Sequence, residues 1–514
     1  MHGNSLWGGP QPRDSLLKGS LMTLLEMTPS AQIRSAAVPE TRALPTIIQG
    51  GMGVAVSSWQ LARSVSQTGQ LGVVSGTALD AVIARRLQDA DEGGHVRRAL
   101  RHFPVPALAE RVLQRYFRPA GRAPGIPYLP IAKLSQHPLV KSLELSVVAN
   151  FAEVWLAKEG HDGLVGINFL EKVQLATPSA AYGAMLAGVD YVLMGAGIPT
   201  EIPALLNALA EHRTCTLDLH VEDSNTRYCV EFAPRALMGP GGSGVPTRLR
   251  RPQFLAIVAA HVLAVYLTRE EATRPDGFVI EGPRAGGHNA PPRGRGALDD
   301  DGQPIYGPRD DADLAKVAAV GLPFWVAGGY GTPERVAEAL ALGAAGVQVG
   351  TLFALAAESG LDESLRAQLL SRVEGPGLQI RTDPLASSTG FPFKVATLPG
   401  TLSDEAIYDE RPRFCDLGYL RVPYERTPGV LGYRCPAEPV ATFVRKGGSA
   451  EEAAGRKCLC NALTANVSLG QTRRDGYEEV PLVTLGTDLD GVTALLSAHP
   501  AGWTAAHAVA YLEG

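Results

Sequence analysis

The chain has 514 residues, of which 45% are hydrophobic and 19% charged, so a sizeable buried core is expected and wholesale disorder is excluded. Its 47 basic and 52 acidic residues give a net charge of −5, which argues against a protein that holds nucleic acid by neutralising phosphates. No apolar run approaches the roughly 18 residues of a membrane-spanning helix, and six cysteines are too few for a disulfide scaffold, so we expect a cytoplasmic protein without membrane partners.

Short β-branched runs alternate with helical stretches from about residue 44 onward. Repeated strand–helix units form parallel sheets with right-handed crossovers, and eight such units close into an α/β fold of the (β/α)8 or TIM barrel type. An open, doubly wound sheet is the alternative, and we favour the barrel because the count is eight. The expected strands are residues 46–49, 71–75, 164–168, 191–194, 215–219, 277–281, 323–327 and 346–349.

Helix-forming stretches fill the intervals between these strands. Ser58 and Thr332 are placed to cap two of them, and Thr177 followed by Pro178 is typical of the start of a third. Gly343 is placed to end the last one. The expected helices are residues 58–68, 178–187, 199–212, 253–269, 310–320 and 332–342.

Three segments exceed a minimal barrel. Residues 77–162, after the second strand, contain amphipathic stretches and predict a helical insertion. Residues 221–252, after the fifth strand, are rich in Gly, Pro and Arg and predict a loop or lid. We therefore divide the chain into a flexible segment at 1–43, a barrel at 44–399, and a C-terminal extension at 400–514 that lacks strand–helix periodicity.

Glycines follow several of the predicted strands, at the end where barrel active sites lie. Gln49-Gly50-Gly51-Met52-Gly53 ends the first strand, where glycine lets the backbone approach a flat ligand. Ala327-Gly328-Gly329 follows the seventh strand and Gly350-Thr351 the eighth, and loops at these two places form the usual phosphate site of barrels. These motifs predict a phosphorylated cofactor across the barrel mouth, with tight-turn packing as the alternative.

A histidine follows the sixth strand, in the run Glu281-Gly-Pro-Arg284-Ala285-Gly286-Gly287-His288-Asn289. A lone histidine is usually structural. On a Gly-Gly loop at the catalytic face, however, it is well placed for proton transfer, because its reference pKa is near 6.5. We therefore predict His288 as a catalytic residue.

Together these motifs resemble the nitronate monooxygenase family, formerly called 2-nitropropane dioxygenases, and the related flavin-dependent enoyl-ACP reductases. The resemblance implies a TIM barrel that carries FMN. It runs from about Pro45 to Ser359 and rests on residues 285–288, 327–329, 341–351 and 353–359.

The resemblance also implies roles for single residues. His288 would be the general base that removes a substrate α-proton or assists flavin reduction. Gly328, Gly329, Gly350 and Thr351 would hold the FMN phosphate. The other implied FMN-binding residues are Gln49, Gly50, Gly51 and Met52 against the isoalloxazine ring, and Asn168, Gly286, Gly287 and Ala327, with Gly195 and Gly197 lining the same mouth.

Two departures from the family pattern concern the substrate. Arg284 stands where the family usually has Glu, and Asn289-Ala290 stands where it usually has Arg-Gly. Because Arg binds anions, we expect substrate handling to differ.

The leading hypothesis is an FMN-dependent oxidoreductase that oxidises alkyl nitronates with O2. One alternative is an NAD(P)H-dependent enoyl reductase of lipid or polyketide synthesis, which would act on an enoyl thioester held by a carrier protein. Another is a flavin-binding module without turnover. The oligomeric state is left open.

Four of the six cysteines, Cys415, Cys435, Cys458 and Cys460, lie in the predicted extension. Four thiolates are able to hold zinc or an iron–sulfur cluster. Their spacing differs from the usual Cys-x2-4-Cys pattern, so we expect small, unligated core residues and no metal.

Overall fold

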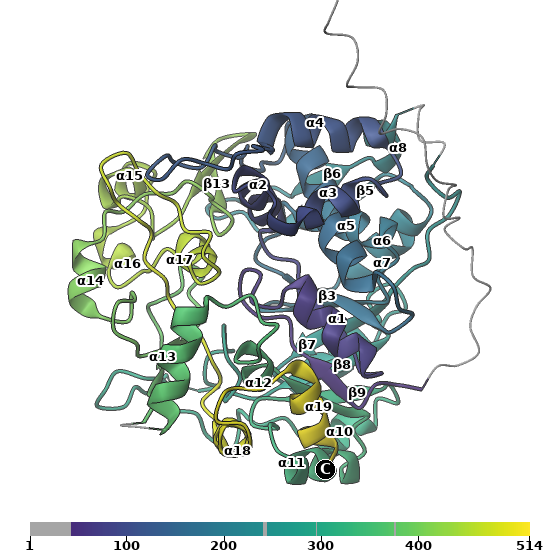
Figure 1. Ribbon diagram of the computed structural model, residues 1–514, viewed down its shortest axis with the longest axis vertical. Coiled ribbons are helices and arrows are strands. Elements are labelled where there is room, and N and C mark those ends of the chain that lie inside the picture. The colour runs from purple at the N-terminus through teal and green to yellow at the C-terminus, as the bar shows by residue number, and fades with distance from the viewer. Residues whose placement is uncertain (1–42, 240–243, 295, 375–376) are drawn as a thin grey trace, which may run out of the picture. The chain divides into compact units, whose positions relative to one another are not determined.

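The centre of this computed structural model is a sheet of eight parallel strands (Figure 1). Residues 45–514 form one compact unit. The segment predicted to be flexible, 1–43, lies outside the described residues except for its last residue. The structure describes residues 43–239, 244–294, 296–374 and 377–514.

The sheet closes on itself. The Gln49 amide donates to the Leu71 carbonyl at 2.9 Å, and the Leu71 amide donates to the Ile47 carbonyl at 3.1 Å, which joins the first and last strands. A closed ring of eight parallel strands confirms the TIM barrel and excludes the open sheet. In spatial order the strands are β1 (Ile47–Gln49), β10 (Gly346–Val349), β9 (Phe324–Ala327), β8 (Gly277–Glu281), β7 (Gln253–Val258), β4 (Tyr191–Gly195), β3 (Val165–Leu170) and β2 (Gly72–Ser75).

Alternate residues of these strands belong to two separate cores, because successive side chains of a strand point to opposite faces. One set, which includes Ile48, Val73, Leu193 and Trp325, forms a cluster of its own and fills the barrel. The neighbouring residues, such as Ile47, pack in the larger cluster shared with the surrounding helices. The barrel interior is therefore solid, and ligands have room only at its mouth.

The fifth barrel strand is not the predicted one. Residues 215–219 form β5 (Cys215–Leu219), which pairs antiparallel with β6 (Tyr228–Phe232) in a hairpin outside the barrel. The fifth strand is β7, inside the stretch predicted as a helix at 253–269; its helical part is only α9 (His261–Leu267). Periodicity does not separate a short, fully apolar run from a buried helix. The predicted insertion at residues 221–252 therefore lies before the fifth barrel strand, and it contains β6 and α8 (Pro234–Met238).

Most predicted helices are present. Ser58 accepts a hydrogen bond from the Leu61 amide, and Thr332 accepts one from the Arg335 amide, so both caps are confirmed. Thr177 is the first helical residue and not a cap. The helices are α1 (Trp59–Gln67), α6 (Thr177–Leu186), α7 (Ile202–Ala210), α10 (Leu314–Ala318) and α11 (Pro333–Ala341).

The insertion after β2 is helical, as predicted. Its longest member, α5 (Val140–Lys158), packs against α1 and α6 of the barrel and against α2 (Leu79–Gln88). The insertion also contains α3 (His95–Leu100) and α4 (Pro106–Tyr116). In the part of the chain that the structure describes, no helix combines the length and apolarity needed to cross a membrane.

The C-terminal residues return to the barrel. Helix α19 (Ala505–Glu513) packs between α1 and α11, the place of the eighth helix in a complete ring. Just before it, the Trp503 indole donates to the Leu352 carbonyl at 2.9 Å. The other elements after β10 are α12 (Thr351–Ala354), α13 (Glu363–Glu374), β11 (Ile380–Asp383), β12 (Phe393–Ala396), α14 (Glu405–Glu410), β13 (Val422–Thr427), β14 (Val430–Arg434), α15 (Val440–Arg445), α16 (Ala450–Ala453), α17 (Leu459–Ala465) and α18 (Asp490–Ala498). The boundary at residue 399 stays a prediction.

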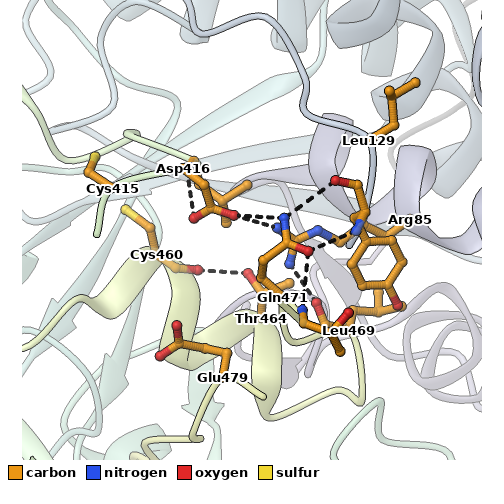
Figure 2. A network of polar contacts seen from close by, with 12 residues as sticks. Arg85, Leu129, Cys415, Asp416, Cys460, Thr464, Leu469, Gln471 and Glu479 are labelled. Carbon is orange, nitrogen blue, oxygen red and sulfur yellow. Dashed lines mark hydrogen bonds and ion pairs between the residues drawn. The ribbon is translucent and has the colours of Figure 1, made fainter. Parts of the chain in front are cut away.

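A buried polar network joins the helical insertion to the extension (Figure 2). Arg85 of α2 donates to the Leu469 carbonyl at 2.6 Å and pairs with Asp416 at 3.2 Å. Gln471 also donates to Asp416, at 3.2 Å. Only 4% of the Arg85 side chain is exposed. Because a buried guanidinium needs such partners, the network fixes the two added segments together.

Candidate active site

The Gly-rich loops meet around a cleft at the carboxyl ends of the strands, here called the loop cavity. Its empty volume, including space open to solvent, is about 920 Å³. The predicted residues that line it are Gly50, Gly51, Met52, Gly286, Gly287, Ala327, Gly328, Gly329, Gly350 and Thr351.

The turn after β9 strongly favours glycine. Gly328 and Gly329 have φ of 88° and 94°, a left-handed region that side-chain-bearing residues rarely adopt. A Cβ on Gly328 would also lie 2.9 Å from the Ala285 amide nitrogen. This turn runs into the N-terminus of α11, where backbone N–H groups and the helix dipole favour an anion.

Two predicted residues lie elsewhere. Gln49 is fully buried; its amide nitrogen donates to Ser57 Oγ at 2.8 Å and its amide oxygen accepts from the Val73 amide at 3.0 Å. Asn168 lines a second cleft and donates to the Gly51 carbonyl at 3.2 Å. Gln49 therefore stabilises the start of the first loop through buried hydrogen bonds, while Asn168 contacts that loop through the Gly51 carbonyl.

The second cleft, here called the histidine cavity, adjoins the loop cavity. Its empty volume is about 740 Å³, and Glu281, Gly286 and Gly287 line both clefts. His288 lies in its wall. The apolar side chains of this cleft are Phe169, Leu170, Ile257, Phe393 and Leu463.

His288 is held by residues far along the chain. Its Nε2 lies 2.7 Å from Ser387 Oγ, and its ring packs edge-on against Phe393 at 4.9 Å between centroids. The Lys394 amide donates to the Gly287 carbonyl at 2.9 Å. Burial, together with the positive charge of Lys172, lowers the pKa of His288 to about 4. The imidazole is therefore neutral at physiological pH and able to accept a proton.

Glu281 is the titratable residue at the junction of the two clefts. Among the described residues, its carboxyl has no hydrogen-bond or ion-pair partner, and burial raises its pKa to about 8. At neutral pH the group is a protonated acid that can donate a hydrogen bond or a proton. The sequence motif includes Glu281, but the charge state of Glu281 depends on its burial, which cannot be inferred from the motif.

The extension also lines the loop cavity, which the sequence did not predict. Thr484, Leu485, Gly486, Asp488 and Gly491 are in its wall. The Gly287 amide donates to Thr484 Oγ1 at 2.8 Å, and the Gly486 amide donates to Thr351 Oγ1 at 3.0 Å. In the sequence, residues 484–491 are a short run rich in polar residues and glycine, which does not differ from an ordinary surface turn.

Arg284 points toward this segment. Its guanidinium lies 3.9 Å from the Asp488 carboxylate, and 60% of its side chain is exposed. An exposed pair at this distance contributes little to stability. Arg284 is therefore available for an anionic ligand at the rim of the loop cavity.

The four cysteines of the extension are free thiols. Cys435 and Cys458 pack with Ala437 in a small apolar cluster, and Cys460 packs against it. Burial raises the pKa of Cys460 to about 12, so its thiol stays protonated at neutral pH. Within the described ranges, no group of three or more His, Cys, Asp or Glu side chains is arranged to hold a metal ion.

The residues of the loop cavity fit a flavin. Buried oxygens of Gln348 in the loop cavity and Asn168 beside it have no hydrogen-bond partner among the described residues. Each needs a donor, and a flavin ring system has an N–H group that can supply one. Glycine at 51 is required as well, because a Cβ there would lie 2.2 Å from the Asn168 Cβ. Gln348 was not predicted, although it lies within the recognised run.

Residues 248–376 match the model of the nitronate monooxygenase family. The resemblance to this family is confirmed. The matched segment contains β7 to β10, the loop that carries His288, and the turn at Gly328 and Gly329. The match supports an enzyme that catalyses an oxidation–reduction.

Solved structures with a similar arrangement are distant in sequence. FabK from Thermotoga maritima has 18% identity and a TM-score of 0.36, with 70% of this chain and 72% of that chain covered. A nitroalkane oxidase from Streptomyces ansochromogenes has 16% identity, a TM-score of 0.35, and coverage of 82% and 96%. The enoyl reductase domain of MlnA from Bacillus amyloliquefaciens has 13% identity, a TM-score of 0.34, and coverage of 71% and 67%. The sequence matches none of the curated proteins with which it was compared.

Proposed function

We propose that the protein is an FMN-dependent oxidoreductase that oxidises alkyl nitronates with O2. The observation that carries the proposal is the adjoining pair of clefts, one glycine-lined with an anion-favouring end and one apolar with His288 in its wall. In the overall reaction, two nitronate anions and one O2 give two carbonyl compounds and two nitrite ions. FMN would supply the electron-transfer chemistry that side chains lack.

The protein's own groups would bind and orient the reactants. The glycine turn at Gly328 and Gly329 would receive the phosphate, with Gly350 and Thr351 beside it, and Gly50 to Met52 would lie against the ring. Phe169, Ile257 and Phe393 would exclude water from the substrate's apolar part. Neutral His288, oriented by Ser387, would accept the α-proton of a nitroalkane at its free ring nitrogen and so form the nitronate that is then oxidised. Protonated Glu281 would donate a hydrogen bond into the junction.

The test combines a spectrum with turnover. The purified protein should show flavin absorption bands, release FMN on denaturation, and consume O2 while forming nitrite from a nitronate. With the parent nitroalkane as substrate, His288→Ala should keep FMN but lose about 100-fold or more in kcat/KM, the usual range for removal of a general base. His137→Ala, a change at an exposed histidine outside both clefts, is the matched control. A colourless protein that cannot be reconstituted with FMN would refute the proposal.

A second candidate is an NAD(P)H-dependent enoyl reductase. The observation that favours it is the apolar wall of the histidine cavity, which also suits the acyl chain of an enoyl thioester presented by a carrier protein. NAD(P)H oxidation that depends on an enoyl thioester would support this candidate over nitronate oxidation. Flavin binding without any turnover, unchanged in His288→Ala, would favour the non-catalytic module.

A further inference from the structure

A third cleft, here called the inner cavity, adjoins the histidine cavity. Thr77, Phe169 and Leu170 line both, and the empty volume of the inner cavity is about 330 Å³. Its wall is made by α2 and α5 of the insertion, by β3 and α6 of the barrel, and by Tyr419 of the extension. The segments added to the minimal barrel therefore extend the histidine cavity inward.

Polar side chains gather at the inner cavity although they are buried. Asn150 is 2% exposed, and its amide nitrogen donates to the Ser146 carbonyl at 2.8 Å. Its amide oxygen is buried without a hydrogen-bond partner among the described residues. A buried acceptor in this state is unfavourable unless a ligand or an ordered water supplies a donor.

A buried carboxyl lies in the same wall. Asp80 is 6% exposed and accepts hydrogen bonds from the Tyr419 hydroxyl and, at 3.0 Å, from the Ala81 amide. No Lys or Arg forms an ion pair with it in the part of the chain that the structure describes. Burial raises the pKa of Asp80. The inner cavity thus presents oxygen acceptors next to Phe169 and Leu170, which also line the histidine cavity.

We propose that the inner cavity is a subsite for the far end of the substrate, and that it selects an apolar chain ending in a hydrogen-bond donor, either a hydroxyl or an amine. The proposal depends on the proposed function in one respect: it places the reacting end of that chain beside His288. Phe169 and Leu170 contact the apolar segment. The oxygen of Asn150 accepts a hydrogen bond from the terminal group, with the Asp80 carboxyl beside it.

Binding to the purified, full-length protein tests the subsite without requiring turnover. Calorimetry compares linear alkanols and alkylamines of four to eight carbons with methyl ethers of the same length, which lack a donor. We expect the best donor-ended probe to bind about tenfold more tightly than its ether, the effect of one hydrogen bond to a buried, unpaired acceptor. Whether the alkanol or the alkylamine binds more tightly identifies the donor as neutral or cationic.

Two variants locate the effect. Asn150→Leu keeps the branched shape of the side chain and removes the acceptor, so the preference for a donor should vanish. Asn466→Leu is the matched control: Asn466 is equally buried, donates to the Leu482 carbonyl, and also has an unpaired oxygen, but lines none of the three clefts. Equal binding of donor and ether in the unaltered protein, or a preference that persists in Asn150→Leu, would overturn the proposal and leave the cavity to solvent.

Turnover provides a separate readout. If nitronates are oxidised, those with a terminal hydroxyl or amine should have kcat/KM about tenfold above the unsubstituted chain, and Asn150→Leu should abolish that ratio. Absence of FMN or of any oxidation would refute the proposed function while the calorimetric result still decides the subsite.

Discussion

Glu281 and His288 are seven residues apart, and burial moves their pKa values in opposite directions. The carboxyl is uncharged below about pH 8 and the imidazole is uncharged above about pH 4. Burial penalises the charged form of both groups, which is why the pKa of the acid rises and that of the base falls. Between these two values the active site contains a neutral donor and a neutral acceptor.

The pH profile of kcat/KM should therefore be flat from about pH 4 to pH 8, without a break near the ordinary histidine pKa of about 6.5. Activity should fall above about pH 8, as Glu281 ionises. Glu281→Gln keeps an uncharged donor and should remove this alkaline limb while leaving the acid limb in place. Steady-state kinetics across pH checks both limbs, and an alkaline limb that persists in Glu281→Gln would contradict the assignment.

The sequence identifies residues whose chemistry lies in a short motif. His288, Gly328, Gly329 and the first glycine loop could be predicted because each is recognisable within a few neighbours. Ser387 and Thr484 could not, because they reach the histidine loop from about 100 and 200 residues further along the chain. Side-chain contacts over such separations depend on folding, which a linear pattern does not encode.

At the scale of elements, the two strands that differ from prediction have a common physical cause. β5 alternates buried and exposed residues, as a hairpin with one solvated face does, whereas five of the six residues of β7 are buried. A prediction based on β-branched runs alone assigns β5 to the barrel and mistakes the apolar β7 for part of a helix. The count of eight was nevertheless correct, because one strand was gained and one lost.

The segment from Thr484 to Gly491 should contribute to FMN affinity. Thr484→Val removes the acceptor of the Gly287 amide, and Gly491→Ala places a Cβ 1.9 Å from the Gly331 carbonyl oxygen, so α18 must shift. Each change should weaken FMN binding about tenfold, the loss expected for one buried hydrogen bond or a displaced loop.

Fluorescence titration of the apoprotein with FMN measures this effect. Gly307→Ala is the control, because an added Cβ there meets no atom within 4 Å and Gly307 lies outside the loop cavity. Unchanged FMN affinity in both test variants would show that the segment only covers the site.

At the scale of the whole molecule, a buried ion pair lies within the C-terminal extension. Arg411 and Glu479 form two hydrogen bonds of 2.7 and 2.9 Å, and their side chains are 4% and 0% exposed. Removing one partner of such a pair leaves a buried charge without compensation, whereas replacing both with apolar residues costs much less.

Glu479→Gln should therefore lower the free energy of unfolding by about 3–5 kcal/mol. The double variant Arg411→Met/Glu479→Leu should recover most of that loss. Urea denaturation followed by circular dichroism measures both. Equal destabilisation by the single and double variants would show that packing, and not charge, dominates at this position.

The position of α19 has a consequence for biosynthesis. Gln70 lies in the turn that follows α1, and its side chain donates to the Glu513 carboxylate of α19 at 2.8 Å. The first and last helices of the ring around the barrel are thus joined across more than 440 residues. At about 5–20 residues per second, a ribosome needs roughly 20 to 90 seconds to make that interval. Throughout it the apolar face of α1 that α19 covers stays open. A chain interrupted before residue 505 would present that face to chaperones and proteases, so quality control could distinguish unfinished molecules by one uncovered helix.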